Sequence, residues 1–389
     1  MPSVDKLDLL IDQQLDHRLT QRPDMFETTS GTWRSSNWRS TFLSHYSLIV
    51  VVATAIGCST RTAPPTNAST KTSTSPVMKR SFTKDQSGKQ IGATLFGSHL
   101  TEASISSLKE HETIVHVTIM ECDEFDAAAF KALNDLPALT RLTIQNCSID
   151  DPALVHLDNV TRLKSLSLLN TKVEGSGLGV LTRLEQLVVA GPAIRVDQLK
   201  TLGALTELRS LEIGCRDLKV TQIESLPKLS KLSSLRFSRA ILDDEAFLAL
   251  PAIPNLKELE FQADELTDRG IARITAFPRL QSLALARSQV TSAGLSHVAS
   301  LKHLESLSLE DCTSVTSDGM QHIALLSELH HLTLRGTGVR FAGLTQLAAN
   351  QKLRELNILT TQASAANLEK LRKLLPNCEI VSIPPNPSG

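Results

Sequence analysis

The residue types best suited to metal binding or nucleophilic chemistry are the eleven histidines and six cysteines of this sequence. The segment HETIVH at 111–116 comes close to the zinc-binding motif H-E-x-x-H but contains one residue too many. His111 and His116 would therefore not share one helix face, as two zinc ligands of that motif must, and the segment runs into an expected strand. His330 and His331, with His303 and His322, form a second group, but adjacent strand residues point to opposite faces. We therefore expect no metal site.

Sequence motifs for other common chemistries are also missing. The chain contains no G-x-S-x-G, no phosphate-binding G-x-x-x-x-G-K-(S or T) and no C-x-x-C. Gly175, Gly177 and Gly179 lie close together, and we expect them to shorten the outer side of a structural unit rather than bind phosphate. The sequence thus predicts a protein that is not an enzyme and uses no cofactor.

A repeat with a nearly constant period organises most of the chain. The pattern L-x-x-L-x-(L, I, V or F) recurs in steps of 24 residues, except for one step of 21 and one of 25. It starts at Leu139, Leu163, Leu184, Leu208, Leu232, Leu256, Leu280, Leu304, Leu329 and Leu353. A period of this size predicts a solenoid, in which neighbouring units stack their leucines into one continuous core.

Each unit is predicted to contain a strand followed by a short helix. In LESLSL at 304–309, apolar and polar residues alternate as in a strand with one buried face. Further along a unit, an apolar residue and then Thr or Asp precede apolar residues at helical spacing, as in Leu266, Thr267, Asp268 and Ile271. A Thr or Asp side chain there can accept hydrogen bonds from the amides of a helix N-terminus. Turns such as LPAL and FPRL then end the helix.

These units resemble the leucine-rich repeat family, on the segments LKSLSL, LRSLEI, LKELEF, LQSLAL, LESLSL and LHHLTL and the helix starts T-x-x-G-L. The resemblance covers roughly residues 90–383 and is closest to the ribonuclease-inhibitor-like or cysteine-containing subclass. It implies an α/β solenoid, a horseshoe with a parallel β-sheet on the concave face and short helices on the convex face. We expect about twelve units within 86–383, followed by a tail at 384–389. Departures from the pattern at Arg216, Arg239 and around Pro192 predict an irregular ladder there.

After each strand the family usually has an inward-pointing asparagine. Here this position holds Cys122, Cys147, Thr171, Ser288, Cys312 and Thr337, with Cys215 one place before it. Hydroxyl and thiol groups can partly satisfy the backbone groups of the loop, as the asparagine does. We expect buried thiols, although a disulfide between Cys122 and Cys147 would be possible in an oxidising compartment.

The segment before the repeats has the parts of a secretory signal. Arg34 and Arg39 precede the apolar run 42–57, which is shorter than the roughly 20 apolar residues of a transmembrane helix. Residues 55–58, AIGC, resemble a bacterial lipobox, which would make Cys58 the lipidated residue. We therefore expect an N-terminal extension at 1–33, unless translation starts near Met25, a signal peptide or uncleaved anchor at 34–57, and a Ser/Thr/Pro-rich linker at 58–85. This predicts an extracytoplasmic, membrane-anchored protein in the periplasm or at the cell surface.

Composition limits the partners. The formal net charge is -1 and aromatic residues make up 4% of the chain, so neither a basic field nor stacking platforms for nucleic acid are expected. Between the framework leucines, the third, fifth and seventh residues of each unit should form columns on the concave face. The most charged stretch of that face is our predicted contact surface: Arg209, Glu212, Arg236, Arg239, Lys257, Glu258 and Glu260. The alternative is a solvated sheet with cross-strand charge pairs.

Two functional hypotheses follow. The first is a non-enzymatic scaffold, membrane-tethered through its N-terminal segment, that binds a protein or a cell-envelope component with its concave face. The second comes from the family resemblance, because similar repeats serve as substrate receptors in F-box ubiquitin ligase complexes, which would make this a cytoplasmic adaptor. An F-box would need a helical domain ahead of the repeats, and residues 1–57 do not contain a convincing one.

Overall fold

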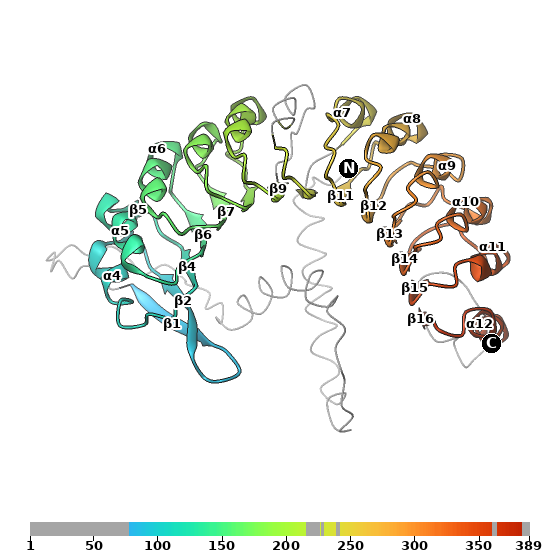
Figure 1. Ribbon diagram of the computed structural model, residues 1–389, viewed down its shortest axis with the longest axis horizontal. Helices are drawn as coiled ribbons and strands as arrows, with labels where there is room; N and C mark the ends of the chain where they lie inside the picture. The colour runs from blue at the N-terminus through green and yellow to red at the C-terminus, as the bar shows by residue number, and fades with distance from the viewer. Residues whose placement is uncertain (1–77, 215–225, 227–228, 239–241, 360–363, 383–389) are drawn as a thin grey trace, which may run out of the picture. The chain divides into compact units, whose positions relative to one another are not determined.

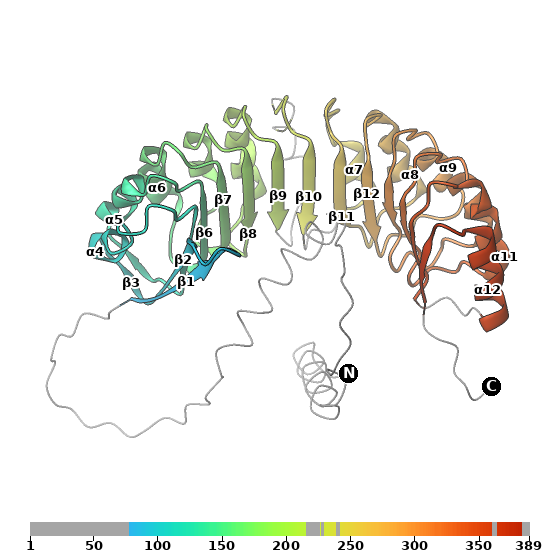
Figure 2. The same cartoon turned by 60° about the horizontal axis from the view of Figure 1, so that its bottom comes forward.

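The computed structural model describes residues 78–214, 226, 229–238, 242–359 and 364–382. Within them a 14-stranded sheet has the order β1-β2-β4-β6-β7-β8-β9-β10-β11-β12-β13-β14-β15-β16. Apart from the antiparallel pair β1 and β2, neighbouring strands are parallel. The strands line the inside of an open arc and the helices lie outside it (Figures 1 and 2). The predicted leucine-rich repeat solenoid is confirmed.

The strands of the sheet are short. Their bounds are β1 Lys79–Lys84, β2 Gln90–Phe96, β4 His116–Met120, β6 Arg141–Cys147, β7 Ser165–Thr171, β8 Gln186–Ala190, β9 Ser210–Gly214, β10 Ser234–Ser238, β11 Glu258–Gln262, β12 Ser282–Ala286, β13 Ser306–Ser308, β14 His331–Thr333, β15 Glu355–Asn357 and β16 Glu379–Val381. A separate two-stranded sheet joins β3 His99–Leu100 to β5 Glu124–Phe125.

Where the outer side of a unit lies within the described residues, it is a short α-helix, a 3-10 helix or both. The α-helices are α4 Glu102–Ser106, α5 Ala127–Ala132, α6 Asp151–Leu154, α7 Asp244–Leu248, α8 Asp268–Ile271, α9 Leu295–Val298, α10 Met320–Ile323, α11 Phe341–Leu344 and α12 Ala365–Leu374. The 3-10 helices are η1 Leu133–Asp135, η2 Val155–Asn159, η3 Ser176–Val180, η4 Val196–Ala204, η6 Ala272–Ala276, η7 Ser317–Gly319 and η8 Thr345–Ala349. The 21-residue unit that contains Gly175, Gly177 and Gly179 has only η3 on its outer side, which fits its shorter length.

The core is one continuous cluster between the sheet and the outer helices. Equivalent leucines pair along the sheet, as in Leu235 with Leu211 and Leu259, and all three are 1% exposed. Phe247 packs against Phe261 and Phe277, with ring centroids 5.1 and 6.5 Å apart. Because no unit encloses its own apolar residues, each unit is stable only against its neighbours.

The N-terminal boundary differs from the sequence prediction. Strand β1 pairs with β2 inside the range 58–85 that we assigned to a linker, so the folded domain begins before residue 86. Asp85 accepts hydrogen bonds from the amides of Ser87 and Lys89, and Gly88 has a φ of 82°, so a tight turn closes the hairpin. The charged strand β1 covers the first edge of the sheet. Its polar sequence, KRSFTK, carries no repeat pattern, so the period could not predict it.

The prediction of an irregular ladder around Pro192 is also wrong, because the sheet is regular there. Strand β8 keeps a regular parallel register with β7 on one side and β9 on the other. The departure is confined to the outer side of this unit, where η4 replaces an α-helix. Arg216 and Arg239 lie outside the described residues.

The inward position after a strand behaves as predicted where the structure describes it, whereas Cys215 lies outside the described residues. Cys122 and Cys147 are buried free thiols, and the amide of Cys122 donates to Sγ of Cys147 at 3.3 Å. Sγ of Cys147 also lies 3.1 Å from the Gln145 carbonyl oxygen, and Oγ1 of Thr337 donates to the Leu334 carbonyl at 2.7 Å. These side chains therefore satisfy backbone groups of the loop, and the structure has no bond between the two cysteines.

Carboxylates at the helix starts link one unit to the next. Asp244, the first residue of α7, accepts hydrogen bonds from the amides of Thr267 (2.8 Å) and Gly270 (3.0 Å) and from the Thr267 hydroxyl (2.6 Å). Asp268 accepts from the amide and hydroxyl of Thr291 one unit later. A Cβ on Gly270 would collide with the Asp244 carboxylate and backbone. The glycine of T-x-x-G-L therefore leaves room for the carboxylate of the preceding unit.

Candidate functional site: the concave face

Strand alternation and register build the concave face as columns of side chains. The first column contains His116, Arg141, Ser165, Gln186, Ser210, Ser234, Glu258, Ser282, Ser306, His331, Glu355 and Glu379. The second contains Thr118, Thr143, Ser167, Val188, Glu212, Arg236, Glu260, Ala284, Ser308, Thr333, Asn357 and Val381. Intervening residues point into the core, so the 24-residue period predicted membership of both columns correctly.

An ion-pair row crosses the middle of this face. Arg236 on β10 lies between Glu212 on β9 and Glu260 on β11 in the second column. Its Nη2 is 2.7 Å from Oε2 of Glu260 and its Nη1 is 3.7 Å from Oε2 of Glu212. One guanidinium is thus shared by two carboxylates, and the shorter pair is the one with Glu260. The cross-strand charge pairing that the sequence offered as an alternative is present.

Burial changes the acidity of one member of this row. Burial raises the pKa of the Glu260 carboxyl above its ordinary value of 4.5, and this outweighs the adjacent Arg236 guanidinium, which lowers it. The negative charge of Glu212 raises the pKa of Glu260 further. The row therefore holds a carboxylate that is harder to keep ionised than an exposed glutamate.

The other predicted contact residues lie in different places. Glu258 is exposed in the first column on β11, on the same face as Glu260. Arg209 and Lys257 precede β9 and β11, at the edge where the strands begin. Nε of Arg209 is 3.8 Å from Glu185, a residue outside the predicted contact surface. The structure thus brings together Glu212, Arg236, Glu260 and Glu258 and separates Arg209 and Lys257 from them, while Arg239 lies outside the described residues.

The N-terminal part of the concave face has apolar side chains that the predicted contact surface did not include. A third column contains Phe96, Met120, Gln145, Leu169 and Ala190. Phe96 is 37% exposed, whereas Met120, Leu169 and the second-column Val188 are half-buried. Alternation along the strand predicted that the seventh residue of each unit lies on this face, and the strand register places it there.

The histidines occupy separate environments. His116 begins β4, as expected for a segment that runs into a strand, and its Nε2 is 3.0 Å from Oγ1 of Thr143. Burial, together with the positive charge of Arg141, lowers the pKa of His116. The rings of His330 and His331 have centroids 6.3 Å apart. Among the described residues, no group of three His, Cys, Asp or Glu side chains is placed to hold a metal ion.

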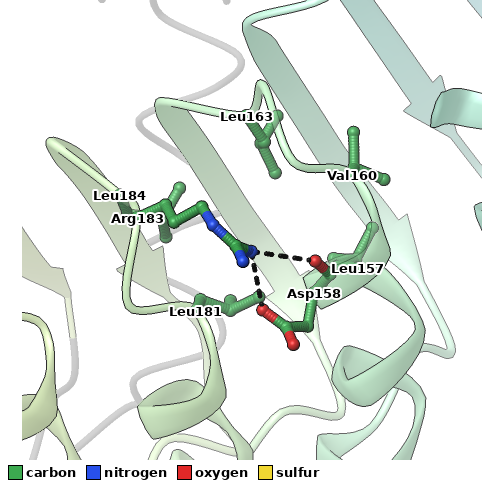
Figure 3. A pocket seen from close by; sticks show the side chains of 7 residues that line it. All are labelled: Leu157, Asp158, Val160, Leu163, Leu181, Arg183 and Leu184. Atoms are coloured by element: carbon green, nitrogen blue, oxygen red, sulfur yellow. Dashed lines mark hydrogen bonds and ion pairs between the residues drawn. The ribbon is translucent and has the colours of Figure 1, made fainter.

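A small hollow lies between consecutive turns away from the concave face (Figure 3). It is lined mainly by leucines such as Leu157 and Leu184, and Arg183 reaches across to donate from Nη1 to the carbonyl oxygen and to Oδ1 of Asp158, both at 3.2 Å. The hollow is open to solvent and has almost no enclosed space for a ligand. It is an inter-unit groove closed by a polar contact.

Cys58 and the apolar run 42–57 lie outside the described residues. None of the helices in the described ranges combines the length and apolar character required to cross a bilayer.

Comparison with known proteins assigns the family. A family model for a leucine-rich repeat region matches residues 131–379. The chain belongs to the leucine-rich repeat family. No curated protein sequence matches this leucine-rich repeat chain.

Three solved structures are similar to this chain. An internalin of Listeria monocytogenes is 17% identical and the alignment covers 76% of this chain and 87% of that one, with a TM-score of 0.49. A chain of the yeast Rad7–Elc1 complex is 19% identical over 72% of this chain and 83% of that one, with a TM-score of 0.52. A leucine-rich repeat protein of Leptospira interrogans is 15% identical over 70% and 91%, with a TM-score of 0.35. Similarity at these identities concerns the fold.

Proposed function

We propose that this protein is a non-enzymatic scaffold whose concave face binds a protein or a cell-envelope component, and that it is exported and tethered to a membrane through Cys58. The observation that carries the binding proposal is the mixed-charge row Glu212–Arg236–Glu260 at the centre of a long sheet face. Its side chains are 20%, 28% and 38% exposed, so they are ordered by the sheet yet accessible to a partner.

The physical argument concerns preorganisation. Side chains on paired strands are fixed in spacing, and cross-strand ion pairs restrict their rotamers, so less entropy is lost when they bind than for free surface side chains. The sheet also places successive units about 4.8 Å apart, which lets one partner contact several units. A rigid surface with alternating charges favours selective protein binding.

The tethering proposal rests on sequence. Arg34 and Arg39, the apolar run 42–57 and the AIGC segment at 55–58 together resemble the signal of an exported lipoprotein. The Ser/Thr/Pro-rich residues that follow Cys58 would space the repeats from the membrane surface. Location in the periplasm or at the cell surface follows from this proposal.

A charge-swapped variant tests the binding surface. Full-length protein is used as bait in cross-linking and capture, and the wild type is compared with the double variant Arg236→Glu, Glu260→Lys. The swap keeps an ion pair between positions 236 and 260 but reverses its direction and removes the cation beside Glu212. Once circular dichroism melting shows that the variant is folded, a partner recognising this row should be recovered at least about tenfold less well. The matched control is Glu207→Lys, Lys231→Glu, which swaps an ion pair in the lateral turns, the turns that precede the strands. Equal recovery by all three proteins would show that this row is not the contact surface.

Fatty-acid labelling tests the tether. Wild-type protein and the variant Cys58→Ser are labelled in cells with a radioactive or clickable fatty acid and then fractionated. The tethered scaffold predicts label and membrane recovery for the wild type only. A protein that is soluble and unlabelled in both forms would contradict it, and would leave the cytoplasmic adaptor as the alternative.

A further inference from the structure

The two ends of the concave face differ in chemistry. From β2 to β8 the larger side chains of the second and third columns are mostly apolar, namely Phe96, Met120, Leu169 and Val188, with Gln145 as the polar exception. The first column of these strands carries His116, Arg141 and Gln186. From β9 to β16 the first two columns carry five glutamates and one arginine: Glu212, Glu258, Glu260, Glu355, Glu379 and Arg236. The formal net charge of the whole chain is -1, so this acidity is a local property of the face.

The two regions adjoin one another. Val188 on β8 pairs in register with Glu212 on β9, so the apolar region ends at the strand where the acidic region starts. Gly214 occupies the third column on β9, where a Cβ would collide with Ala190 and Ser238. On β9 the third column therefore carries only a hydrogen atom.

In its first two columns the acidic region carries five carboxylates and one guanidinium. Arg236 is shared by Glu212 and Glu260, at 3.7 and 2.7 Å. Glu258 lies two residues before Glu260 on the same face of β11, which separates the two Cα atoms by about 7 Å. Like charges at this spacing repel, and a further cation between them would relieve the repulsion.

We infer that the concave face binds a segment of a partner protein that carries apolar residues at one end and Lys or Arg at the other, lying along the row of strands. This rests on the proposed scaffold function and names the class of partner. The apolar end lies over β4 to β8, where Leu169 and Val188 lose solvent exposure. The cationic end lies over β9 to β11, where it meets Glu258 and Glu260.

Strand spacing sets the length of that segment. Three strand intervals of about 4.8 Å separate β8 from β11, or about 14 Å in all. An extended chain advances about 3.3 Å per residue, so about four residues separate the apolar and cationic positions of the partner. The apolar contacts supply affinity through burial, and the carboxylates fix the direction of the segment.

Selection from a random peptide library tests this inference. The library is panned on full-length wild-type protein, on the variant Glu258→Lys, Glu260→Lys, and on the control Glu207→Lys, Glu328→Lys, which has the same charge change on the lateral turns. Circular dichroism melting confirms that all are folded. We expect peptides from the wild type and the control to show at least about a threefold excess of Lys and Arg over the naive library. We expect that excess to disappear on the concave-face variant.

A peptide from the wild-type pool then separates the two regions. Its dissociation constant should rise about tenfold on Glu258→Lys, Glu260→Lys and on raising NaCl from about 50 to about 500 mM. On Leu169→Ser, Val188→Ser it should rise at least about fivefold with an unchanged salt dependence, because the lost contribution is apolar burial.

The outcomes are distinguishable. A pool without excess Lys or Arg that is still lost on Glu258→Lys, Glu260→Lys would overturn the cationic partner while keeping the concave face as the binding surface. A pool that no concave-face variant affects, or no pool at all on the wild type, would overturn the inference. In that case the capture experiment on the Arg236/Glu260 swap decides separately whether the scaffold proposal stands.

Discussion

Replacement of Asp244 by alanine gives the sharpest test of how neighbouring units hold each other. The Asp244 carboxylate accepts two amide hydrogen bonds and one hydroxyl hydrogen bond from the next unit, at 2.8, 3.0 and 2.6 Å. A hydrogen bond to a charged group contributes about 1.5–3 kcal/mol, but Asp244 is only half-buried, so water replaces part of the loss. We expect Asp244→Ala to lower the free energy of unfolding by about 2–4 kcal/mol.

The adjacent acid is a matched control. Glu245 forms an ion pair with Arg269 at 2.7 Å, but the two side chains are 70% and 65% exposed. An exposed pair of this kind contributes about 0–1 kcal/mol, so Glu245→Ala should have a small effect. Asp244→Asn keeps the shape and one acceptor oxygen and should fall between the two.

The assay is urea unfolding of the full chain, followed by far-ultraviolet circular dichroism, with the slope of free energy against urea compared between variants. A repeat protein can unfold in parts, so equal slopes are required before free energies are compared. If Asp244→Ala and Glu245→Ala destabilise the protein equally, to within about 0.5 kcal/mol, the Asp244 carboxylate does not hold neighbouring units together.

Three further outcomes are expected. Cys122 and Cys147 are buried, and burial raises their pKa values to about 11 and about 12. At neutral pH, alkylation mapped by mass spectrometry should therefore modify these thiols only after unfolding. Rapid labelling of the native protein would contradict their burial. The pKa of Glu260 is raised above 4.5, so this carboxylate loses its charge at a higher pH than an exposed glutamate does. On acidification, binding of a cationic peptide, measured by fluorescence anisotropy, should therefore begin to weaken at a higher pH in the wild type than in Glu260→Gln. Identical pH profiles would refute this. Gly270→Ala should cost about 1–3 kcal/mol in urea unfolding because its Cβ would collide with Asp244, and an unchanged midpoint would show that the contact relaxes freely.

The repeat period predicted the architecture well because every unit solves the same packing problem. Leucines at fixed spacing must face one core, and strand alternation then decides which residues reach the opposite face. Both columns of the concave face followed from this rule, as did the inward position of Cys122, Cys147 and Cys312. Strand β1 did not follow from it, since a charged hairpin that covers a sheet edge needs no leucine pattern.

Charge pairing was less predictable than column membership. Position along the repeat placed Glu212, Arg236 and Glu260 in one row, and the structure joins them. Arg209 has the same kind of side chain but precedes its strand, so it turns to the edge and meets Glu185. A rule based on alternation fails at the residue where the strand begins, because the backbone there is still turning.

The sequence by itself determined that this protein is a leucine-rich repeat solenoid, which residues form its core, and which side chains line its concave face. These properties depend on the periodic spacing of apolar residues, which can be read directly from the sequence. Only the tertiary structure decided which charges meet, how Asp244 joins one unit to the next, and that an apolar region borders an acidic one along the face. Those features depend on the register between units that are 24 residues apart, and that register exists only once the units are stacked.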